Sequence, residues 1–376
     1  MNAKRDYWNR GRKTATHRNT RTSTHTLFLS ALFLAWTGCG KGPVVARSQW
    51  FTMGTVAAIQ TQSMEEAKKG RELVQPLFER VNTLFSIWQE TSELSLLNQA
   101  AGKNVSTPLS LEVGTLVAAA LQIADASNGA FNPLAGSLMS VWGFTQERAP
   151  SSLPSEEALQ EARKLADWRQ IQFCPTTTPV RLYLPHPGMK LDLGAIAKGY
   201  AVDLAYNRLT QVGTTNALID LGGNLRAIGE ASPGRGGWRT GIRNPFLEGS
   251  CTAQFLLTNG EAVATSGNYE RFVEIANRRY AHIMDARTGR PVKGMAGVTV
   301  VAPSAILADA LSTTLFVLGP EEGVVFLKRY PGCEAIWIPD TPEKLTLLCT
   351  PGIVGRLTLL GKKNVLVRSL LNEAKQ

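Results

Sequence analysis

Residues 280–291 read Tyr-Ala-His-Ile-Met-Asp-Ala-Arg-Thr-Gly-Arg-Pro. The stretch holds His282, one of only four histidines among 376 residues, and Asp285 follows three positions later. Residues 280–284 predict a short strand, since aromatic and apolar residues lead into a turn signal. Alternation then puts His282 and Met284 on one face of that strand. A strand end with His and Asp beside a Gly/Pro turn would expose reactive groups. The alternative is a hairpin whose histidine caps its own backbone.

Outward from this stretch, strands and helices mix without a regular strand–helix–strand repeat. Apolar residues recurring at the helical period predict helices at residues 64–86, 111–127, 156–165 and 305–318, with a short one starting at 92–94. Another helix is predicted to follow the stretch at 192–200 and to run through residue 209. Strands are predicted at residues 50–61, 189–193, 217–221, 238–244, 253–257, 262–266, 297–302, 326–330 and 335–339. This mixture favours an α+β fold with mixed, largely antiparallel sheets and packed helices over a doubly wound fold.

The first 38 residues have the composition of an export signal. They carry seven Lys/Arg against one acidic residue, which accounts for +6 of the net charge of +10 and leaves +4 for the remainder. An apolar run at 27–36 follows, and then Thr-Gly-Cys39-Gly. Such an order is typical of a secretory signal. A cysteine after small residues resembles a bacterial lipobox, with Cys39 lipidated and first in the mature chain. The alternatives are an ordinary cleaved signal or an uncleaved anchor.

We therefore expect a lipoprotein signal at residues 1–38 and a tether at 39–49. A lipid on Cys39 would hold the protein at the cell membrane on its periplasmic, extracytoplasmic side. The body of the chain has no basic stripe interleaved with aromatic residues, so a nucleic-acid partner is not expected. It also has no apolar run of about 18 residues, the length that predicts an ordinary spanning helix.

The remaining cysteines do not form a metal motif. Cys174, Cys251, Cys333 and Cys349 lack the CxxC spacing of a zinc site. The last three lie among strand-like residues and are predicted to be buried. A disulfide between Cys333 and Cys349 stays open, because the sequence alone does not decide it.

An acidic residue in the apolar helix at 305–318 indicates a cation site. Asp309 would be costly there unless it is paired or bound to a metal. Thr313 is four residues further on, so both side chains share one helix face. A carboxylate and a hydroxyl suit a hard cation such as Mg²⁺, which prefers oxygen ligands. The alternative is a solvated helix edge.

Two glycine-containing turns would suit a phosphate ligand. Residues 192–195, Asp-Leu-Gly-Ala, join a strand end to a helix start, where free backbone N–H groups bind anions. Lys198 would add positive charge. Gly222 and Gly223 would let the backbone approach a ligand, and Asn224 could bond a ring edge; a plain hairpin turn is the alternative. With Trp88 and Phe131 available for stacking, these features suggest an enzyme acting on nucleotide phosphates. The GxGxxG, Walker and Gly-x-Ser-x-Gly motifs are absent.

Six motifs in order make a more specific pattern than any one of them. They are Thr-Met-Gly-Thr at 52–55, the Asp-Leu-Gly-Ala-Ile-Ala-Lys-Gly-Tyr-Ala-Val-Asp stretch at 192–203, Ile-Asp-Leu-Gly-Gly-Asn at 219–224, Thr-Ser-Gly-Asn-Tyr-Glu-Arg at 265–271, His-Ile-Met-Asp-Ala-Arg-Thr-Gly-Arg-Pro at 282–291 and Ala-Asp-Ala-Leu-Ser-Thr at 308–313. Over about residues 50–340 the chain resembles the FAD:protein FMN transferases, the ApbE flavin transferases. The resemblance implies a T-fold-like architecture and a catalytic domain at 50–365.

The resemblance also implies an activity. Members of this family use Mg²⁺ to cleave the FAD pyrophosphate and join FMN by a phosphodiester to a Thr or Ser of a partner flavoprotein, releasing AMP. His282 would be the base for the acceptor hydroxyl, and Asp285 its orienting or metal-side neighbour. Metal ligands would be Ala195 through its carbonyl, Asp309, Ser312 and Thr313. The positions matching FAD contacts are Met53, Trp88, Ala130, Phe131, Asn132, Asp192, Lys198 and Ile283.

Two positions depart from the family pattern. Asn132 stands where relatives often have Asp, and Lys198 stands where some have Glu. Both leave the base and the metal ligands in place, so activity is expected. The alternatives are an extracytoplasmic FAD pyrophosphatase that releases FMN and AMP, and a flavin-binding lipoprotein without catalysis. The expected acceptor is an extracytoplasmic or membrane-bound redox protein, such as a subunit of a redox pump or a respiratory flavoprotein.

Overall fold

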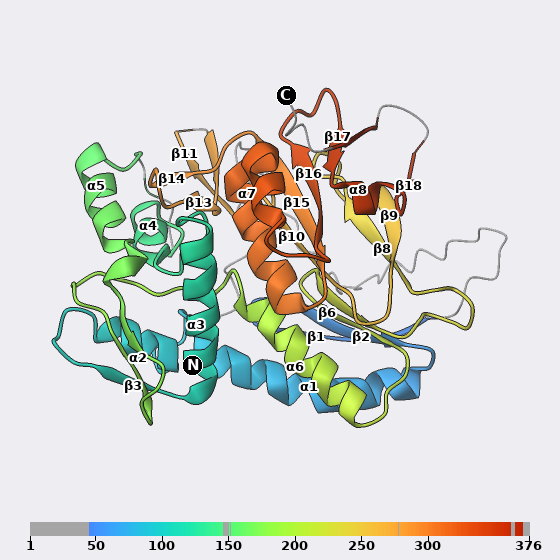
Figure 1. Cartoon of the computed structure of the whole chain (residues 1–376), viewed down its shortest axis with the longest axis horizontal. Coiled ribbons are helices and arrows are strands. Elements are labelled where there is room, and N and C mark those ends of the chain that lie inside the picture. Colours follow the sequence, from blue (N-terminus) through green and yellow to red (C-terminus); the bar gives the residue numbers. More distant parts are fainter. Residues whose placement is uncertain (1–44, 146–149, 151, 277, 362–364, 371–376) are drawn as a thin grey trace, which may run out of the picture. The chain divides into compact units, whose positions relative to one another are not determined.

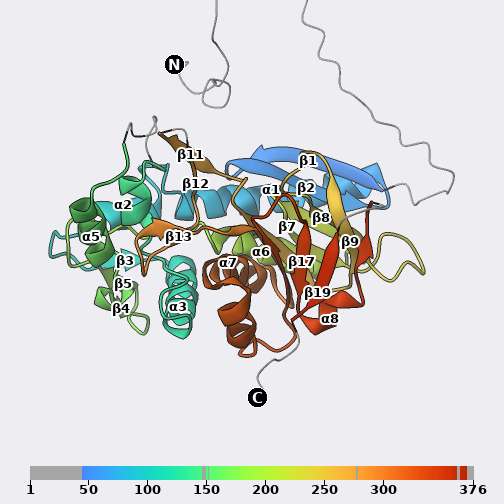
Figure 2. The same ribbon diagram turned by 90° about the horizontal axis from the view of Figure 1, so that it is seen from above.

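The computed structural model describes residues 45–145, 150, 152–276, 278–361 and 365–370. The predicted signal at 1–38, Cys39 and the tether as far as residue 44 lie outside these ranges. Within them, the largest element is a nine-stranded sheet in the order β1-β2-β6-β7-β10-β15-β16-β17-β19 (Figures 1 and 2). Its strands are β1 (Ala46–Thr52), β2 (Thr55–Thr61), β6 (Ala217–Leu221), β7 (Asn224–Ile228), β10 (Ala262–Gly267), β15 (Met295–Ala302), β16 (Glu334–Pro339), β17 (Thr346–Cys349) and β19 (Leu366–Ser369). Neighbours pair antiparallel except β17 and β19, which are parallel.

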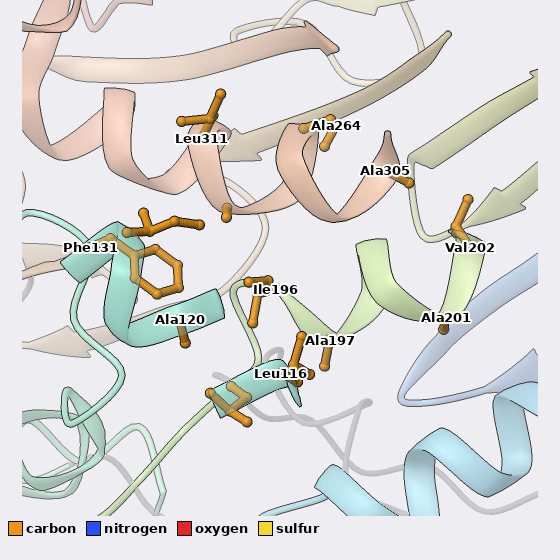
Figure 3. Close-up of a cluster of buried hydrophobic side chains, with 14 of the residues drawn as sticks. Leu116, Ala120, Phe131, Ile196, Ala197, Ala201, Val202, Ala264, Ala305 and Leu311 are labelled. Carbon is orange, nitrogen blue, oxygen red and sulfur yellow. The ribbon is translucent and has the colours of Figure 1, made fainter. Parts of the chain in front are cut away.

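Three helices cover one face of this sheet, namely α1 (Met64–Phe85), α6 (Ala197–Gln211) and α7 (Ala305–Leu327). The apolar side chains of these helices pack against every second residue of the strands, namely those that point toward the helices. Together they form the main hydrophobic core. Figure 3 shows part of this core, with Ala197 and Ala201 of α6, Ala305 and Leu311 of α7, and Ala264 of β10. The small side chains let α6, α7 and the sheet approach one another closely. This close packing positions the polar groups of the candidate site, which lie where these elements meet.

The opposite face of the sheet packs on a three-stranded sheet. It consists of β8 (Trp238–Arg243), β9 (Cys251–Leu257) and β18 (Thr358–Leu359), and the short helix α8 (Pro351–Val354) lies nearby. Trp238, Ile242, Phe255 and their neighbours fill the space between the two sheets. Apolar residues therefore occur on both faces of the central strands, and each strand's alternation separates the two cores.

A lateral layer of short elements lies beside the helices, at the left of Figure 1. It contains the helices α2 (Glu93–Gln99), α3 (Leu111–Ala126), α4 (Gly136–Val141), α5 (Glu156–Leu165) and η1 (Trp168–Gln170), and the small sheet of β3 (Thr107–Leu109), β5 (Val180–Tyr183) and β4 (Gln172–Cys174). Two hairpins complete it, β11 (Phe272–Ile275) with β12 (Arg278–Ala281), and β13 (Met284–Asp285) with β14 (Arg290–Pro291). Helices α4 and α5 share a small core with these hairpins.

The predicted α+β class with largely antiparallel sheets is confirmed. The helices predicted at 64–86, 111–127 and 156–165 are present, and Ser92 caps α2 through a bond from the Ser95 amide. The helix predicted at 305–318 is also present. It continues to Leu327 after a break at Gly319, whose φ of 72° is not helical.

Several strand predictions were wrong. Residues 50–61 form the β1–β2 hairpin and not one strand, because Met53 (φ 48°) and Gly54 (φ 73°) adopt the left-handed backbone of a tight turn. Residues 189–193 belong to no strand of the described chain, and Phe326 and Leu327 end α7. The strand predicted at 280–284 is interrupted, since β12 ends at Ala281 and β13 starts at Met284.

The cysteine predictions hold in part. Cys333 and Cys349 are buried, and both are free thiols, so the disulfide left open between them is not formed. Burial raises the pKa of Cys333 to about 11 and that of Cys349 to about 12. Cys251, predicted to be buried, is exposed at the start of β9.

By length and composition alone, α7 is the one helix among the described residues that could cross a membrane. Its apolar window is 56% buried inside the fold. Most of the apolar side chains that make it resemble a spanning helix therefore pack against the sheet. This explains why an apolar helix here gives only weak evidence of a membrane span.

Gly199 marks the closest approach of α6 and α7. A Cβ built there would lie 2.2 Å from the carbonyl oxygen of Ala305 and 2.6 Å from its carbonyl carbon. Because these are backbone atoms, the helices would have to separate. We expect Gly199→Ala to lower the free energy of unfolding by about 3 kcal/mol, measured by urea denaturation. Gly355→Ala is the matched control, since a Cβ there meets nothing within 4 Å. Equal stability of the two variants would contradict this packing.

Candidate active site

The sequence motifs gather at one edge of the central sheet. Strand β2 begins there at Thr55, β6 ends at Leu221, β7 begins at Asn224 and β10 ends at Gly267. Neighbouring antiparallel strands run in opposite directions, so the start of one meets the end of the next. The two turns at this edge touch, because the Gly222 amide donates to the Val56 carbonyl at 3.0 Å.

Asp309 is buried where α6 meets α7. It is 4% exposed, and its Oδ2 accepts a hydrogen bond from the Gly199 amide at 2.9 Å. The Lys198 ammonium lies 3.5 Å from Oδ1 and also donates to the Gly194 carbonyl at 3.1 Å. The lysine therefore neutralises the carboxylate and ties it to the turn before α6. The solvated helix edge considered from the sequence is wrong, since α6 covers this side of α7.

Three hydroxyl groups lie together at the next turn of α7, two of them on the helix and the third on β10. The Ser266 hydroxyl, at the end of β10, is 2.8 Å from that of Ser312 and 3.2 Å from that of Thr313. Ser312 also donates to the Asp309 carbonyl at 2.8 Å. In the ranges described, no group of three or more His, Cys, Asp or Glu side chains is placed so that it could hold a metal ion. One carboxylate with neutral oxygens nearby is the donor set that suits Mg²⁺, which keeps waters and shares substrate phosphates.

His282 lies at the bend between β12 and β13, partly buried. Its Nδ1 is 3.1 Å from the Arg271 carbonyl oxygen, which also accepts the His282 amide at 3.1 Å. A carbonyl only accepts, so Nδ1 carries the proton and Nε2 has a free lone pair. Burial, helped by the positive charges of Arg271 and Lys198, lowers the pKa of His282 to about 4, although the hydrogen bond to the Arg271 carbonyl acts in the opposite direction. The imidazole is therefore neutral at pH 7.

Lys198 connects the two halves of the site. Its charge acts on His282, and its ammonium lies 3.5 Å from Asp309. The same positive charge therefore acts on the histidine and lies beside the carboxylate near the oxygen cluster. That these groups form one reaction site stays a prediction. Burial and the two nearby positive charges together keep the imidazole of His282 neutral.

The orienting role predicted for Asp285 is wrong. Its Oδ1 accepts from the Arg287 amide at 3.0 Å and from Arg287 Nε at 2.9 Å, and its Oδ2 accepts from Arg287 Nη2 at 3.0 Å. Asp285 thus holds the turn between β13 and β14, and the Arg271 carbonyl orients His282. Whether Asp285 assists a metal is a prediction that no contact here tests.

The predicted stacking pair separates into one exposed and one buried ring. Trp88, just after α1, is 57% exposed, and the Arg271 guanidinium lies 5.8 Å from its ring centroid. Phe131 is 2% exposed and packs in the main core, as Figure 3 shows. Its side chain is therefore unavailable for stacking on a ligand, contrary to the prediction. Trp88 stays the candidate for stacking because its ring is accessible. It lies next to Arg271, the residue whose carbonyl bonds His282.

The remaining predicted flavin contacts lie in bends and turns. Asn132 donates to the Ala166 carbonyl and accepts from the Leu134 amide, both at 2.8 Å, so its side chain supports the loop before α4. Asp192 accepts from the Gly194 amide at 2.8 Å and shapes the turn into α6. Met53 forms the β1–β2 turn, while Ala130 and Ile283 are buried. Their contacts with a flavin, and the Ala195 carbonyl as a metal ligand, stay predictions.

Sequence reasoning missed three groups that the structure brings into the site. They are the Ser266 hydroxyl, the Arg271 carbonyl and the Gly199 amide. All three lie within the motifs at 192–203 and 265–271, so the motifs carried a signal. What was lacking was the side-by-side placement of β10, α6 and α7, which long-range packing determines.

Comparisons with known proteins agree with this geometry. A sequence model described as the ApbE family matches residues 53–337. A FAD:protein FMN transferase of Treponema pallidum is 35% identical, over 84% of this chain and 90% of that protein, and one of Klebsiella pneumoniae is 33% identical, over 80% and 90%. An ApbE protein structure from Thermotoga maritima has a TM-score of 0.71 at 31% identity, covering 79% of this chain and 94% of that one. The flavin transferase ApbE from Vibrio cholerae has a TM-score of 0.72 at 27% identity, covering 83% and 99%.

Proposed function

The chain belongs to the ApbE family, and on that premise we propose that it transfers FMN from FAD to an acceptor protein. The observation that carries this proposal is the position of Lys198, whose charge acts on the His282 base while its ammonium lies 3.5 Å from Asp309. A neutral base and an oxygen-rich cation site thereby serve one reaction centre.

The residues suggest how the step proceeds. His282 Nε2 takes the proton of an acceptor Thr or Ser hydroxyl, and the hydroxyl oxygen attacks the phosphorus on the FMN side of the pyrophosphate. The new P–O bond makes a phosphodiester, and the bond to the AMP phosphate breaks, so AMP leaves with the electron pair. The Arg271 carbonyl keeps the imidazole in the tautomer that accepts at Nε2.

A magnesium ion fits the oxygen groups of this site. Asp309, Ser312 and Thr313, with the backbone carbonyl at 195, would hold it next to the pyrophosphate. When bound, the ion offsets charge that develops on the phosphoryl oxygens and the leaving group. Lys198 contributes a fixed positive charge in the same place. Asp309 then has to exchange part of its contact with the ammonium for the metal.

Intact mass spectrometry tests the proposed transfer. Purified full-length protein is incubated with FAD, Mg²⁺ and candidate acceptor domains that carry exposed Thr or Ser, and free AMP is followed by chromatography. We expect an FMN adduct on the acceptor together with AMP, and loss of both with EDTA. Release of FMN and AMP without an adduct on any of several acceptors would overturn transfer in favour of a pyrophosphatase. FAD binding with no product would leave a binding protein.

The pH dependence of transfer gives an independent check on the base. Because the pKa of His282 is lowered to about 4, the base stays unprotonated well below neutral pH. We expect kcat/KM to fall only as the pH approaches about 4. Arg271→Gln removes a positive charge that lowers this pKa, so the fall should begin at higher pH. Arg271→Lys, which keeps the charge, should not move it. A shared fall near the ordinary histidine pKa would contradict the assignment.

The leader is proposed to anchor the protein at the membrane through a lipid on Cys39, facing the extracytoplasmic space. Its support is the basic segment, apolar run and small-residue site before that cysteine. Tethering would raise the local concentration of the enzyme near membrane-bound acceptors. Cys39→Ser should move the protein from the membrane to the soluble fraction and remove label from a radioactive fatty acid. Retention in the membrane by the variant would point to an uncleaved anchor.

A further inference from the structure

Asn224, the first residue of β7, has a buried oxygen with no partner. The side chain is 3% exposed, and its Oδ1 accepts no hydrogen bond from any described residue. A buried, unpaired amide oxygen costs folding free energy, roughly 1–3 kcal/mol. Such a group at the edge where the functional motifs meet calls for a ligand that supplies a positive charge or a donor.

The alternation of β7 places Asn224 on the helix side of the sheet. Two residues on, Arg226 bonds Asp203 of α6 at 2.6 Å, whereas the intervening Leu225 packs toward the smaller sheet. Asn224 and Arg226 share a face because strand side chains alternate. Asn224 therefore faces the layer of α6 and α7, where Asp309 and the hydroxyl cluster lie.

The register brings Asn224 close to that cluster. Leu225 pairs with Val263 and Arg226 with Ala262. Continued by one residue, this register sets Asn224 opposite Ala264, which Figure 3 shows beside Ala305 and Leu311 of α7. Ser266 follows two residues later on the same face, a diagonal neighbour at about 7–8 Å between Cα atoms. A cation held between Asn224 and the α7 hydroxyls that Ser266 contacts would bridge that separation.

We propose that Asn224 Oδ1 is a further oxygen ligand of the divalent cation at this site. The inference rests on the cation of the proposed function and adds a residue from the sheet to the donors on α7. An amide oxygen suits a hard cation, adds no charge, and leaves the balance between Lys198 and Asp309 unchanged. The cation would satisfy the oxygen that the protein leaves unpaired, which explains why a polar side chain is buried there.

Binding of Mn²⁺ to the purified full-length protein, followed by the electron paramagnetic resonance of free Mn²⁺ without flavin, tests this inference apart from activity. Asn224→Leu keeps roughly the size and removes the oxygen, so Mn²⁺ affinity should fall at least about tenfold. Asn224→Asp adds a charge at the same oxygen and should tighten Mn²⁺ binding. Thr252→Val is the matched control, because Thr252 Oγ1 is likewise buried without a partner but lies on β9. It should leave Mn²⁺ binding unchanged.

FAD binding in EDTA, measured by flavin fluorescence, separates a cation ligand from a flavin contact. Under the proposal Asn224→Leu leaves FAD affinity in EDTA unchanged. Loss of FAD affinity with unchanged Mn²⁺ binding would overturn the proposal and assign the oxygen to a donor on the flavin. Unchanged binding of both, or no tightening by Asn224→Asp, would also overturn it. A failure to form the FMN adduct by wild-type protein that still binds Mn²⁺ through Asn224 would instead refute the proposed transfer.

Discussion

His282→Asn is expected to slow FMN transfer by about 10²–10⁴-fold, the usual contribution of a general base. Asparagine can place its amide N–H where Nδ1 donates to the Arg271 carbonyl, so the bend between β12 and β13 should keep its shape. It offers no basic nitrogen to the acceptor hydroxyl. The rate of adduct formation, followed by intact mass, should fall while the FAD affinity and the melting temperature stay close to those of the wild type.

His186 supplies the control for this experiment. It is the second histidine in the described ranges and lies exposed in the turn after β5. His186→Ala should transfer FMN at the wild-type rate. If His282→Asn retained more than about a tenth of the wild-type rate at saturating FAD, another group would be the base. The hydrogen bond by which the Arg271 carbonyl orients His282 would then not contribute to catalysis.

Local signals in the sequence predicted the elements that carry the site. The spacing of apolar residues predicted the bounds of α1, α3 and α5 to within one residue. An acidic residue within an apolar helix marked Asp309, which is buried, as a candidate functional residue. These features depend on neighbours within one or two helical turns, which a sequence displays directly. The order of the motifs further predicted that His282 and Asp309 belong to one site, because the resemblance to the family covers most of the chain.

Features that depend on tertiary packing were not accessible in the same way. The partner of Asp309 is the Gly199 amide, 110 residues away, and the partner of His282 Nδ1 is a backbone carbonyl. Backbone partners leave no side-chain signature. Asp285 misled for a related reason, since a carboxylate near a histidine suggested a pair, whereas Arg287 two residues on took both of its oxygens. The stacking role predicted for Phe131 was wrong because an aromatic residue in a sequence is equally compatible with a hydrophobic core and with a binding site.

Asp309→Asn is expected to raise the Mg²⁺ concentration needed for half-maximal transfer by at least about 100-fold. The amide keeps an oxygen for the Gly199 N–H, so the contact between α6 and α7 should survive. It removes the negative charge that attracts the cation, and the positive charge of Lys198, 3.5 Å away, is left to repel it. Transfer rates measured across a Mg²⁺ titration, beside urea unfolding of the same variant, separate the loss of the cation from a loss of fold.

Asp285→Asn is the informative comparison for that titration. Its carboxylate binds Arg287 through both oxygens, so the variant should loosen the turn between β13 and β14 and leave the Mg²⁺ requirement near that of the wild type. A rise as large as that of Asp309→Asn would show that Asp285 does serve the metal, as the resemblance allowed. An unchanged Mg²⁺ requirement for both variants would remove the carboxylate from the cation site altogether. Lys198, with Asp309 as its ion-pair partner, would then be the charge that matters at the pyrophosphate.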